Sequence, residues 1–556
     1  MNALKTQLIL DYELVFKEKP PTNRISLIKH ISKESILYEI AALNYRLKPK
    51  YVVNIDSSFD TQVKELKHFT QTHELFTKYS RVAEKYTESK NNYPIIFNRQ
   101  ACLFAIEEII GSSEMRTDEA YVLSKIEDWD TIIKYYLAVN YVITQIKEEK
   151  DDDEVIFESL NAKLLPLNEL QIETDPLFTP FRGYWLIDYF LNKPDFKEHV
   201  IKYFQEVYRI EPQHFIFLLM EMYLANQAEH PDHNFYYQIQ EEKQYFFDKL
   251  SVRNPNNEIY KLINIRKSPF INVGKLKYLL ADNSFLLDKS YSQFLNDFWF
   301  DKIKHIMDEN GAPKFTFQVY RSEFGYFFER YISTILKRSF ENYKYSTLLM
   351  FDQLKIYLHK EPIEIADVYL RYNNKILLGQ VKSGSIYDTE KFGGDMELLY
   401  KNDRNKFFDN FGVNQVVQSL YRMDEHILKV DHKFPKGHSY EVYPCIIVND
   451  KAFQTPLMAN TFNTRFQELL KDFNIKKVKV NPLTLFHISD FERLEDSLNK
   501  KPQQIWELLK YNHKGKIVPP FYNTINLNSL FRQYPARIKE LFNSLILKYN
   551  PNETKT

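Results

Sequence analysis

Two periods of hydrophobic and polar positions divide the chain into a first part of about 300 residues and a remainder. In the first part, apolar residues recur every three to four positions, which is the spacing of one helix face. The stretch 32–49 ends near Pro49 and carries such a stripe, made of Ile36, Leu37, Ile40, Leu43 and Leu47. Residues 120–150 and 185–250 repeat the pattern, and only three of the twelve glycines fall in this part. We therefore predict an all-α N-terminal region of long helices joined by short polar loops.

From about residue 310 the pattern changes to alternating and continuous apolar runs, which are typical of β-strands. Such runs occupy 365–372, 375–382, 441–449, 476–480 and 483–489. Segments with helical spacing alternate with them, at 323–340, 412–430 and 459–473. This alternation predicts an α/β domain in which helices flank a mixed sheet.

Length and charge divide this multidomain chain further. We expect two helical regions over 1–150 and 151–310, an α/β domain over 311–500 and a basic helical extension over 501–556. The acidic run 148–154 is a candidate surface loop at the first boundary.

The formal net charge is zero but is unevenly distributed along the chain. The first 300 residues hold 36 Lys and Arg against 44 Asp and Glu, whereas 501–556 holds nine against three. A nucleic-acid partner would therefore meet the C-terminal half, because phosphate contacts need lysine and arginine. The alternative for the basic end is a solvated helix with a frayed terminus.

Composition excludes several classes of protein. No run of eighteen uncharged apolar residues is present, so we expect no transmembrane helix and no membrane partner. The N-terminus meets Asp11 and Glu13 directly after a short apolar run, which makes it a poor secretory signal. Cys102 and Cys445 lie far apart, which excludes a disulfide framework and favours a cytoplasmic protein.

Three polar residues interrupt the apolar runs at 365–372 and 375–382: Asp367, Gln380 and Lys382. A two-residue turn at Asn373-Asn374 would join the runs as a hairpin, because asparagine tolerates the positive φ that such turns need. The register then places Asp367 opposite Gln380, with all three polar side chains on one face. The other face would form core, from Ala366, Val368, Leu370, Leu377 and Val381.

This arrangement resembles the PD-(D/E)xK nuclease superfamily, whose fold is the restriction-endonuclease-like fold. The Gln-x-Lys form, Gln380 to Lys382, is most similar to the Mrr-type branch. The segment "FGYFFERYI" resembles the superfamily's first helix and supplies Glu329. On the next helix, Gln415 and Gln418 match the glutamine that often assists the site. The resemblance covers roughly residues 320–495 and not the first 300.

The resemblance implies a metal-dependent nuclease, with DNA favoured over RNA as substrate and a role in restriction or antiviral defence. Mg²⁺, with Mn²⁺ as a substitute, would be held by the side chains of Glu329, Asp367 and Gln380 and the carbonyl of Val381. Lys382 would orient the attacking water and stabilise the charge formed during reaction. Basic residues beyond the hairpin would bind nucleic acid: Lys401, Arg404 and Lys406.

The chain departs from the family pattern at two positions. Ala366 stands where a proline often precedes the acid, and Gln380 replaces the usual Glu or Asp. A neutral amide brings no charge to a metal. This leaves open a catalytically inactive module of the same fold that binds nucleic acid, or a protein partner through the helical region, without cutting. A helical scaffold is a further alternative, in which the acidic first part binds a protein partner or another copy of the chain.

The tripeptide alone carries no information, because Gln62-Val63-Lys64 repeats it near the N-terminus. No hairpin pattern surrounds that copy, and we expect it to be a solvated helix start.

Overall fold

The structure is a computed structural model. It describes residues 8–48, 58–87, 93–117, 123, 125–144, 156–172, 174–228, 235–253, 262–358, 361–391, 399–400, 404–434, 439–471, 478–527 and 534–550. The acidic run 148–154 lies outside the described residues. No described helix is long and apolar enough to cross a membrane.

The first part of the chain is helical, as predicted. Its α-helices are α1 (Tyr12–Phe16), α2 (Lys33–Arg46), α3 (Phe59–Thr70), α4 (His73–Lys85), α5 (Arg99–Gly111) and α6 (Ile126–Thr144). The stripe predicted on α2 is fully buried and joins the core of this region. The helical period therefore identified both the element and its buried face.

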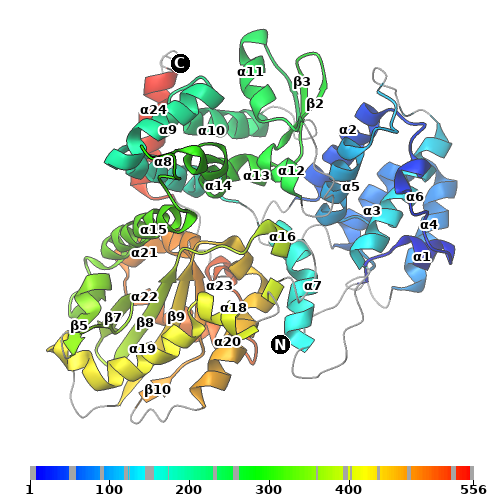
Figure 1. The fold of residues 1–556 in the computed structure, drawn as a ribbon. Coiled ribbons are helices and arrows are strands. Elements are labelled where there is room, and N and C mark those ends of the chain that lie inside the picture. The colour runs from blue at the N-terminus through cyan, green and yellow to red at the C-terminus, as the bar shows by residue number, and fades with distance from the viewer. Residues whose placement is uncertain are drawn as a thin grey trace.

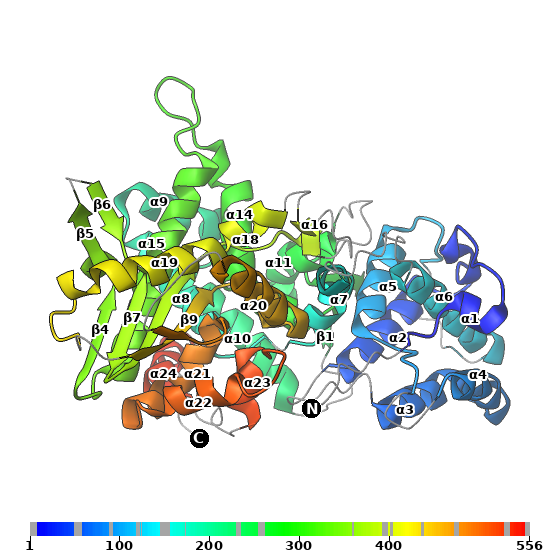
Figure 2. The ribbon, with the colours of Figure 1, turned by 90° about the horizontal axis from the view of Figure 1, so that it is seen from below.

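A second set of helices follows. It comprises α7 (Ile156–Leu170), α8 (Phe178–Leu191), α9 (Pro194–Val207), α10 (Pro212–Ala228), α11 (Glu241–Lys249), α12 (Ile263–Lys267), α13 (Asn283–Asp288) and α14 (Ser292–Asp301). Helix α7 packs against α5 of the first set and α20 (Pro456–Leu470) of the α/β part. In Figure 2 it lies between the first helical set and the large sheet.

The prediction of an all-α region is wrong at residues 236–238, 270–274 and 277–280, which form a three-stranded antiparallel sheet. Its strands are β1 (Tyr236–Gln238), β2 (Phe270–Gly274) and β3 (Lys277–Leu280), in the order β1-β3-β2. Alternate residues of β3 face different cores: Leu279 joins that of the first helices, and Tyr278 joins the larger core. Both faces are thus covered, which removes the alternation of apolar and polar residues that marks a half-exposed strand.

The C-terminal part contains the predicted mixed sheet flanked by helices (Figure 1). Its strands are β4 (Ser346–Met350), β7 (Val368–Tyr372), β8 (Lys375–Lys382), β9 (Tyr440–Val448), β10 (Val478–Val480) and β11 (Thr484–His487). The order is β10-β9-β8-β7-β4, and β11 also pairs with β9. Strand β8 is antiparallel to β7 and parallel to β9, so polar residues at the end of β8 lie beside the end of β9.

Helices cover both faces of this sheet. Helices α15 (Phe317–Phe340) and α21 (Ile488–Lys500) contribute to the core on one face, together with Val368 and Leu377. Helices α18 (Arg404–Asn410), α19 (Val413–His426) and α20 contribute to the core on the other, together with Ile376 and Leu378. Figure 1 shows α19 across the strands on this second face.

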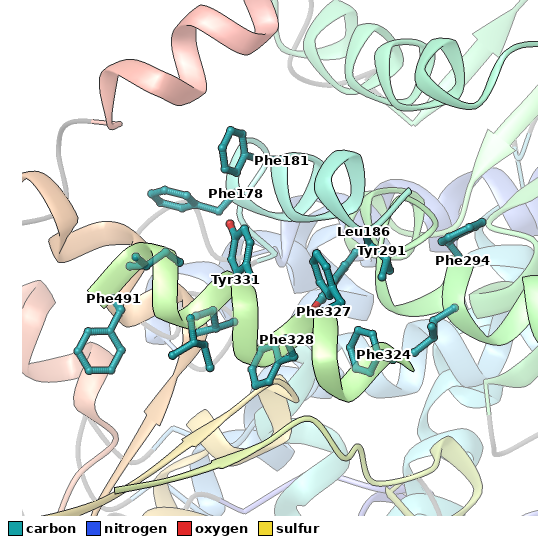
Figure 3. Close-up of a cluster of buried hydrophobic side chains, with 14 of the residues drawn as sticks. Phe178, Phe181, Leu186, Tyr291, Phe294, Phe324, Phe327, Phe328, Tyr331 and Phe491 are labelled. Atoms are coloured by element: carbon teal, nitrogen blue, oxygen red, sulfur yellow. The ribbon is translucent and has the colours of Figure 1, made fainter. Parts of the chain in front are cut away.

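The core on the α15 face extends into both neighbouring parts of the chain. Aromatic side chains of α15 lie between α8 and the sheet (Figure 3). Phe491 of α21 lies beside α15 in the same cluster. The C-terminal helices α22 (Gln504–Asn512), α23 (Phe521–Leu527) and α24 (Ala536–Tyr549) contribute further buried residues. One apolar cluster therefore holds the second helical set, the α/β part and the basic extension together.

Candidate functional site

The hairpin that carries the candidate residues has the predicted register. Tyr372 pairs with Lys375 and Leu370 with Leu377, and Asn373 adopts a φ of 51° in the turn. The regular pairing ends at Val368, but the Asp367 N–H still donates to the Gly379 carbonyl over 3.0 Å. Asp367 therefore lies just before β7, opposite the C-terminal end of β8.

One residue of the predicted core face is misplaced. Val368, Leu370 and Leu377 join the α15-side core, but Ala366 belongs to the core beneath α19. The expectation assumed that the strand begins at residue 365, whereas β7 begins at Val368. Strict alternation holds only within a strand, so it does not predict the direction of Ala366.

The Asp367 carboxylate is fixed by the backbone of the neighbouring strand. The Val381 N–H donates to its Oδ2 over 2.7 Å. Burial raises the pKa of Asp367, while this hydrogen bond and the nearby positive charge of Lys382 lower it. Val381 therefore contacts Asp367 through its N–H. The carbonyl of the same residue is the one predicted as a metal ligand.

Gln380 and Lys382 both face the first turns of α19. The Gln380 Nε2 donates to Ser419 Oγ over 3.0 Å, and the Lys382 Nζ donates to the side-chain carbonyl of Gln415. Gly412, directly before α19, has a φ of +86°, and a Cβ there would lie 2.6 Å from Lys382 Cε. The glycine thus allows α19 to approach the strand closely enough to hold both side chains.

Glu329 lies on α15, and the charges of Asp367 and Lys382 act on its carboxylate. One turn earlier, Gly325 lies close to Ser383. A Cβ at this position would be 3.6 Å from the serine Oγ. Burial raises the pKa of Glu329, and the negative charge of Asp367 raises it further. The helix-borne glutamate and the hairpin therefore form one electrostatic cluster.

Sequence reasoning missed Glu364, a fourth member of this cluster. It lies on β6 (Glu361–Glu364), which pairs with β5 (Lys355–Leu358) in a small hairpin just before Asp367. Burial, and then the charge of Asp367, raise the pKa of Glu364 to about 7. Its position only three residues before Asp367 in "EIAD" was the available signal.

The charges of these three acids act on Lys382, whose ammonium bonds to Gln415. Burial lowers the pKa of its ammonium, while the charges of Asp367, Glu364 and Glu329 raise it. A second cation, Lys355, also lowers the pKa of Glu364 and Asp367 and pairs with Asp352 at 2.6 Å. The three carboxylates and the lysine are all partly buried, and their charges interact. Such an arrangement is suited to cation binding and acid–base chemistry.

The remaining predicted residues have mixed outcomes. Gln418 lies half-buried on α19, and among the described residues no hydrogen bond joins it to Gln380 or Lys382. Lys401 lies outside the described residues, and Arg404 begins α18. Lys406 is exposed on α18, which packs against α19.

The N-terminal copy of the tripeptide begins a helix as predicted, but Gln62 is buried and not solvated. Its side-chain carbonyl accepts from the N–H groups of Ile96 and Phe97, and its Nε2 donates to the Phe97 carbonyl. The buried amide therefore satisfies backbone groups of another segment, a contact that local pattern does not encode.

Within the described residues, no group of three Asp, Glu, His or Cys side chains is placed to hold one metal ion. Mg²⁺ commonly binds one or two carboxylates and completes its shell with an amide, a carbonyl and water.

Comparisons of the chain with family models, with curated proteins and with solved structures found no match.

Proposed function

We propose that the chain is a metal-dependent nuclease whose site comprises Glu329, Asp367, Gln380 and Lys382. One observation carries the proposal. The carboxylates of Glu329 and Asp367 interact electrostatically with each other and with Lys382, although they come from a helix and a hairpin far apart in sequence. By resemblance to the PD-(D/E)xK superfamily, the substrate is nucleic acid, DNA in preference to RNA, and the role is in restriction or antiviral defence.

The donor set fits a hard divalent cation. Asp367 supplies a carboxylate, and Glu329 and Glu364 raise the local negative charge. Gln380 Oε1 and the Val381 carbonyl are neutral oxygen ligands of the kind that Mg²⁺ accepts beside several waters. When bound, the cation would polarise the phosphoryl group and lower the pKa of a bound water.

The residues of the chain would divide the remaining work. Lys382, held by Gln415, would donate to a phosphoryl oxygen as negative charge develops on it. The Val381 N–H would hold the Asp367 carboxylate in position as a metal ligand before substrate arrives. One water is consumed, a P–O bond breaks, and a phosphomonoester and a hydroxyl group form.

The proposal is tested by incubating the full chain with plasmid, linear and single-stranded DNA and with RNA, in Mg²⁺, Mn²⁺ or EDTA. Lys382→Ala should reduce cleavage by about 10²–10³-fold, because it removes a group that stabilises charge in the transition state. Lys375→Ala, at the other end of β8, is the matched control and should cut normally. Retained cleavage in Lys382→Ala, or cleavage of equal rate in EDTA, would reject the assignment.

A second candidate is an inactive module of the same fold that binds nucleic acid without cutting it. The neutral Gln380 and the lack of a three-acid metal group among the described residues favour it. It predicts no metal-dependent cleavage by wild type, together with binding that weakens steeply as salt rises.

A further inference from the structure

Ser419 lies under the Gln-x-Lys segment and is fully buried on α19, with 1% of its surface exposed. Its hydroxyl donates to the Gln415 carbonyl over 2.8 Å, one helical turn earlier. On its other side it accepts from Gln380 Nε2 at 3.0 Å. Figure 1 shows α19 lying across one face of the large sheet.

The proton count fixes the direction of the Gln380 amide. A serine hydroxyl has one proton, and here that proton is directed to Gln415. Only a lone pair of Ser419 Oγ remains for Gln380, so the amide must present its NH₂ group to the serine. The carbonyl oxygen Oε1 is then directed away from α19, and no donor among the described residues bonds to it.

We infer that Ser419 is a positioning residue that holds the Gln380 amide with Oε1, and not Nε2, toward the metal position of the proposed site. The inference rests on the proposed function, because it assigns a role in metal binding. An amide without such a partner can rotate by half a turn and present a donor, which repels a cation.

The same geometry explains why glutamine suits this position. A carboxylate at residue 380 would meet the lone pair of Ser419 unless the hydroxyl turned away from the Gln415 carbonyl. Gln380 is 8% exposed and Ser419 is 1% exposed, so bulk water does not relieve that conflict. Ser419 therefore accepts from an amide at residue 380 while keeping its bond to the Gln415 carbonyl, whereas a carboxylate there would require the hydroxyl to turn.

The test measures Mn²⁺ affinity by titration calorimetry, with Mn²⁺ as the only ligand, and cleavage in parallel. Ser419→Ala should weaken Mn²⁺ binding by about three- to tenfold, which corresponds to one net hydrogen bond. Ser419→Thr keeps the hydroxyl and should bind like wild type. Ser339→Ala is the control, because Ser339 is also fully buried but its Oγ bonds to no described group.

A second background separates orientation from packing. In Gln380→Glu protein both terminal atoms are oxygen, so Ser419→Ala should not weaken Mn²⁺ binding there. An equal loss in both backgrounds would show a packing role and overturn the inference, as would unchanged affinity of Ser419→Ala in the wild-type background. If wild type binds no Mn²⁺ at all, the metal site itself fails, and this role fails with it.

Discussion

Glu364 shows how much of the candidate site depends on burial and not on residue type. It has an ordinary glutamate side chain, yet burial and then the charge of Asp367 raise its pKa to about 7. Burial likewise raises the pKa of Asp367 and Glu329 and lowers that of Lys382. The charges of these residues act on one another, so the protonation of each depends on the others.

A pH dependence follows from this shift. The folded protein keeps the Glu364 proton up to about pH 7, whereas the unfolded chain loses it near 4.5. The resulting stabilisation is complete below pH 4.5 and is lost as pH rises through 7. Without metal, the melting temperature of wild type should therefore fall between pH 5 and 8 by more than that of Glu364→Gln.

Metal binding should show the opposite trend. A cation displaces the proton of Glu364, so Mn²⁺ affinity should rise with pH, by up to about tenfold per unit below pH 7. Glu364→Gln should flatten this slope in calorimetric titrations at pH 6, 7 and 8. Identical slopes for the two proteins would place Glu364 outside the metal environment.

At the scale of elements, local patterns predicted what local contacts determine. The hairpin of β7 and β8 was found with its register, because a two-residue turn and alternating side chains fix both. Strand β4 and the hairpin of β5 and β6 were missed. They are positioned by distant backbone contacts, such as Phe351 N–H to the Asp367 carbonyl at 2.9 Å. The position of Glu364 near the site depends on these backbone contacts, which the spacing of residues in the sequence does not predict.

The junction before α19 gives a prediction at this scale. Gly412→Ala introduces a Cβ at a φ of +86°, 2.6 Å from Lys382 Cε. The backbone strain should cost about 1–2 kcal/mol in the free energy of unfolding. The displaced Lys382 should also lose its contact with Gln415, so activity should fall by more than stability explains.

Chemical denaturation and cleavage rates measured on the same preparations would check this. Gly111→Ala is the control, because Gly111 ends α5 and a Cβ there meets no atom within 4 Å. Normal stability and activity in Gly412→Ala would mean that α19 does not need its close approach to β8.

Across the whole molecule, buried ion pairs join parts of the chain that sequence analysis treated separately. Arg182 of α8 pairs with Glu492 of α21 at 3.1 Å, and Tyr331 of α15 donates to the same carboxylate over 2.7 Å. Elsewhere, the buried Glu169 of α7 pairs with Lys391 at 3.3 Å and Arg266 at 3.7 Å. With the shared aromatic core of Figure 3, these contacts make the helices part of the support for the sheet.

This arrangement predicts that Arg182→Met destabilises the whole chain. It leaves Glu492 buried without its ion-pair partner, which typically costs about 3–5 kcal/mol in the free energy of unfolding. Burial already raises the pKa of Glu492, and losing Arg182 should raise it further, so the loss of stability should be larger at pH 8 than at pH 6.

Urea denaturation at both pH values measures this loss of stability, with the exposed pair Lys548–Glu211 as control. Lys548→Met should change stability by less than about 1 kcal/mol. The double variant Arg182→Met, Glu492→Met should recover much of the loss, because it removes the isolated charge. If Arg182→Met costs no more than Lys548→Met, the pair does not hold α8 to the sheet.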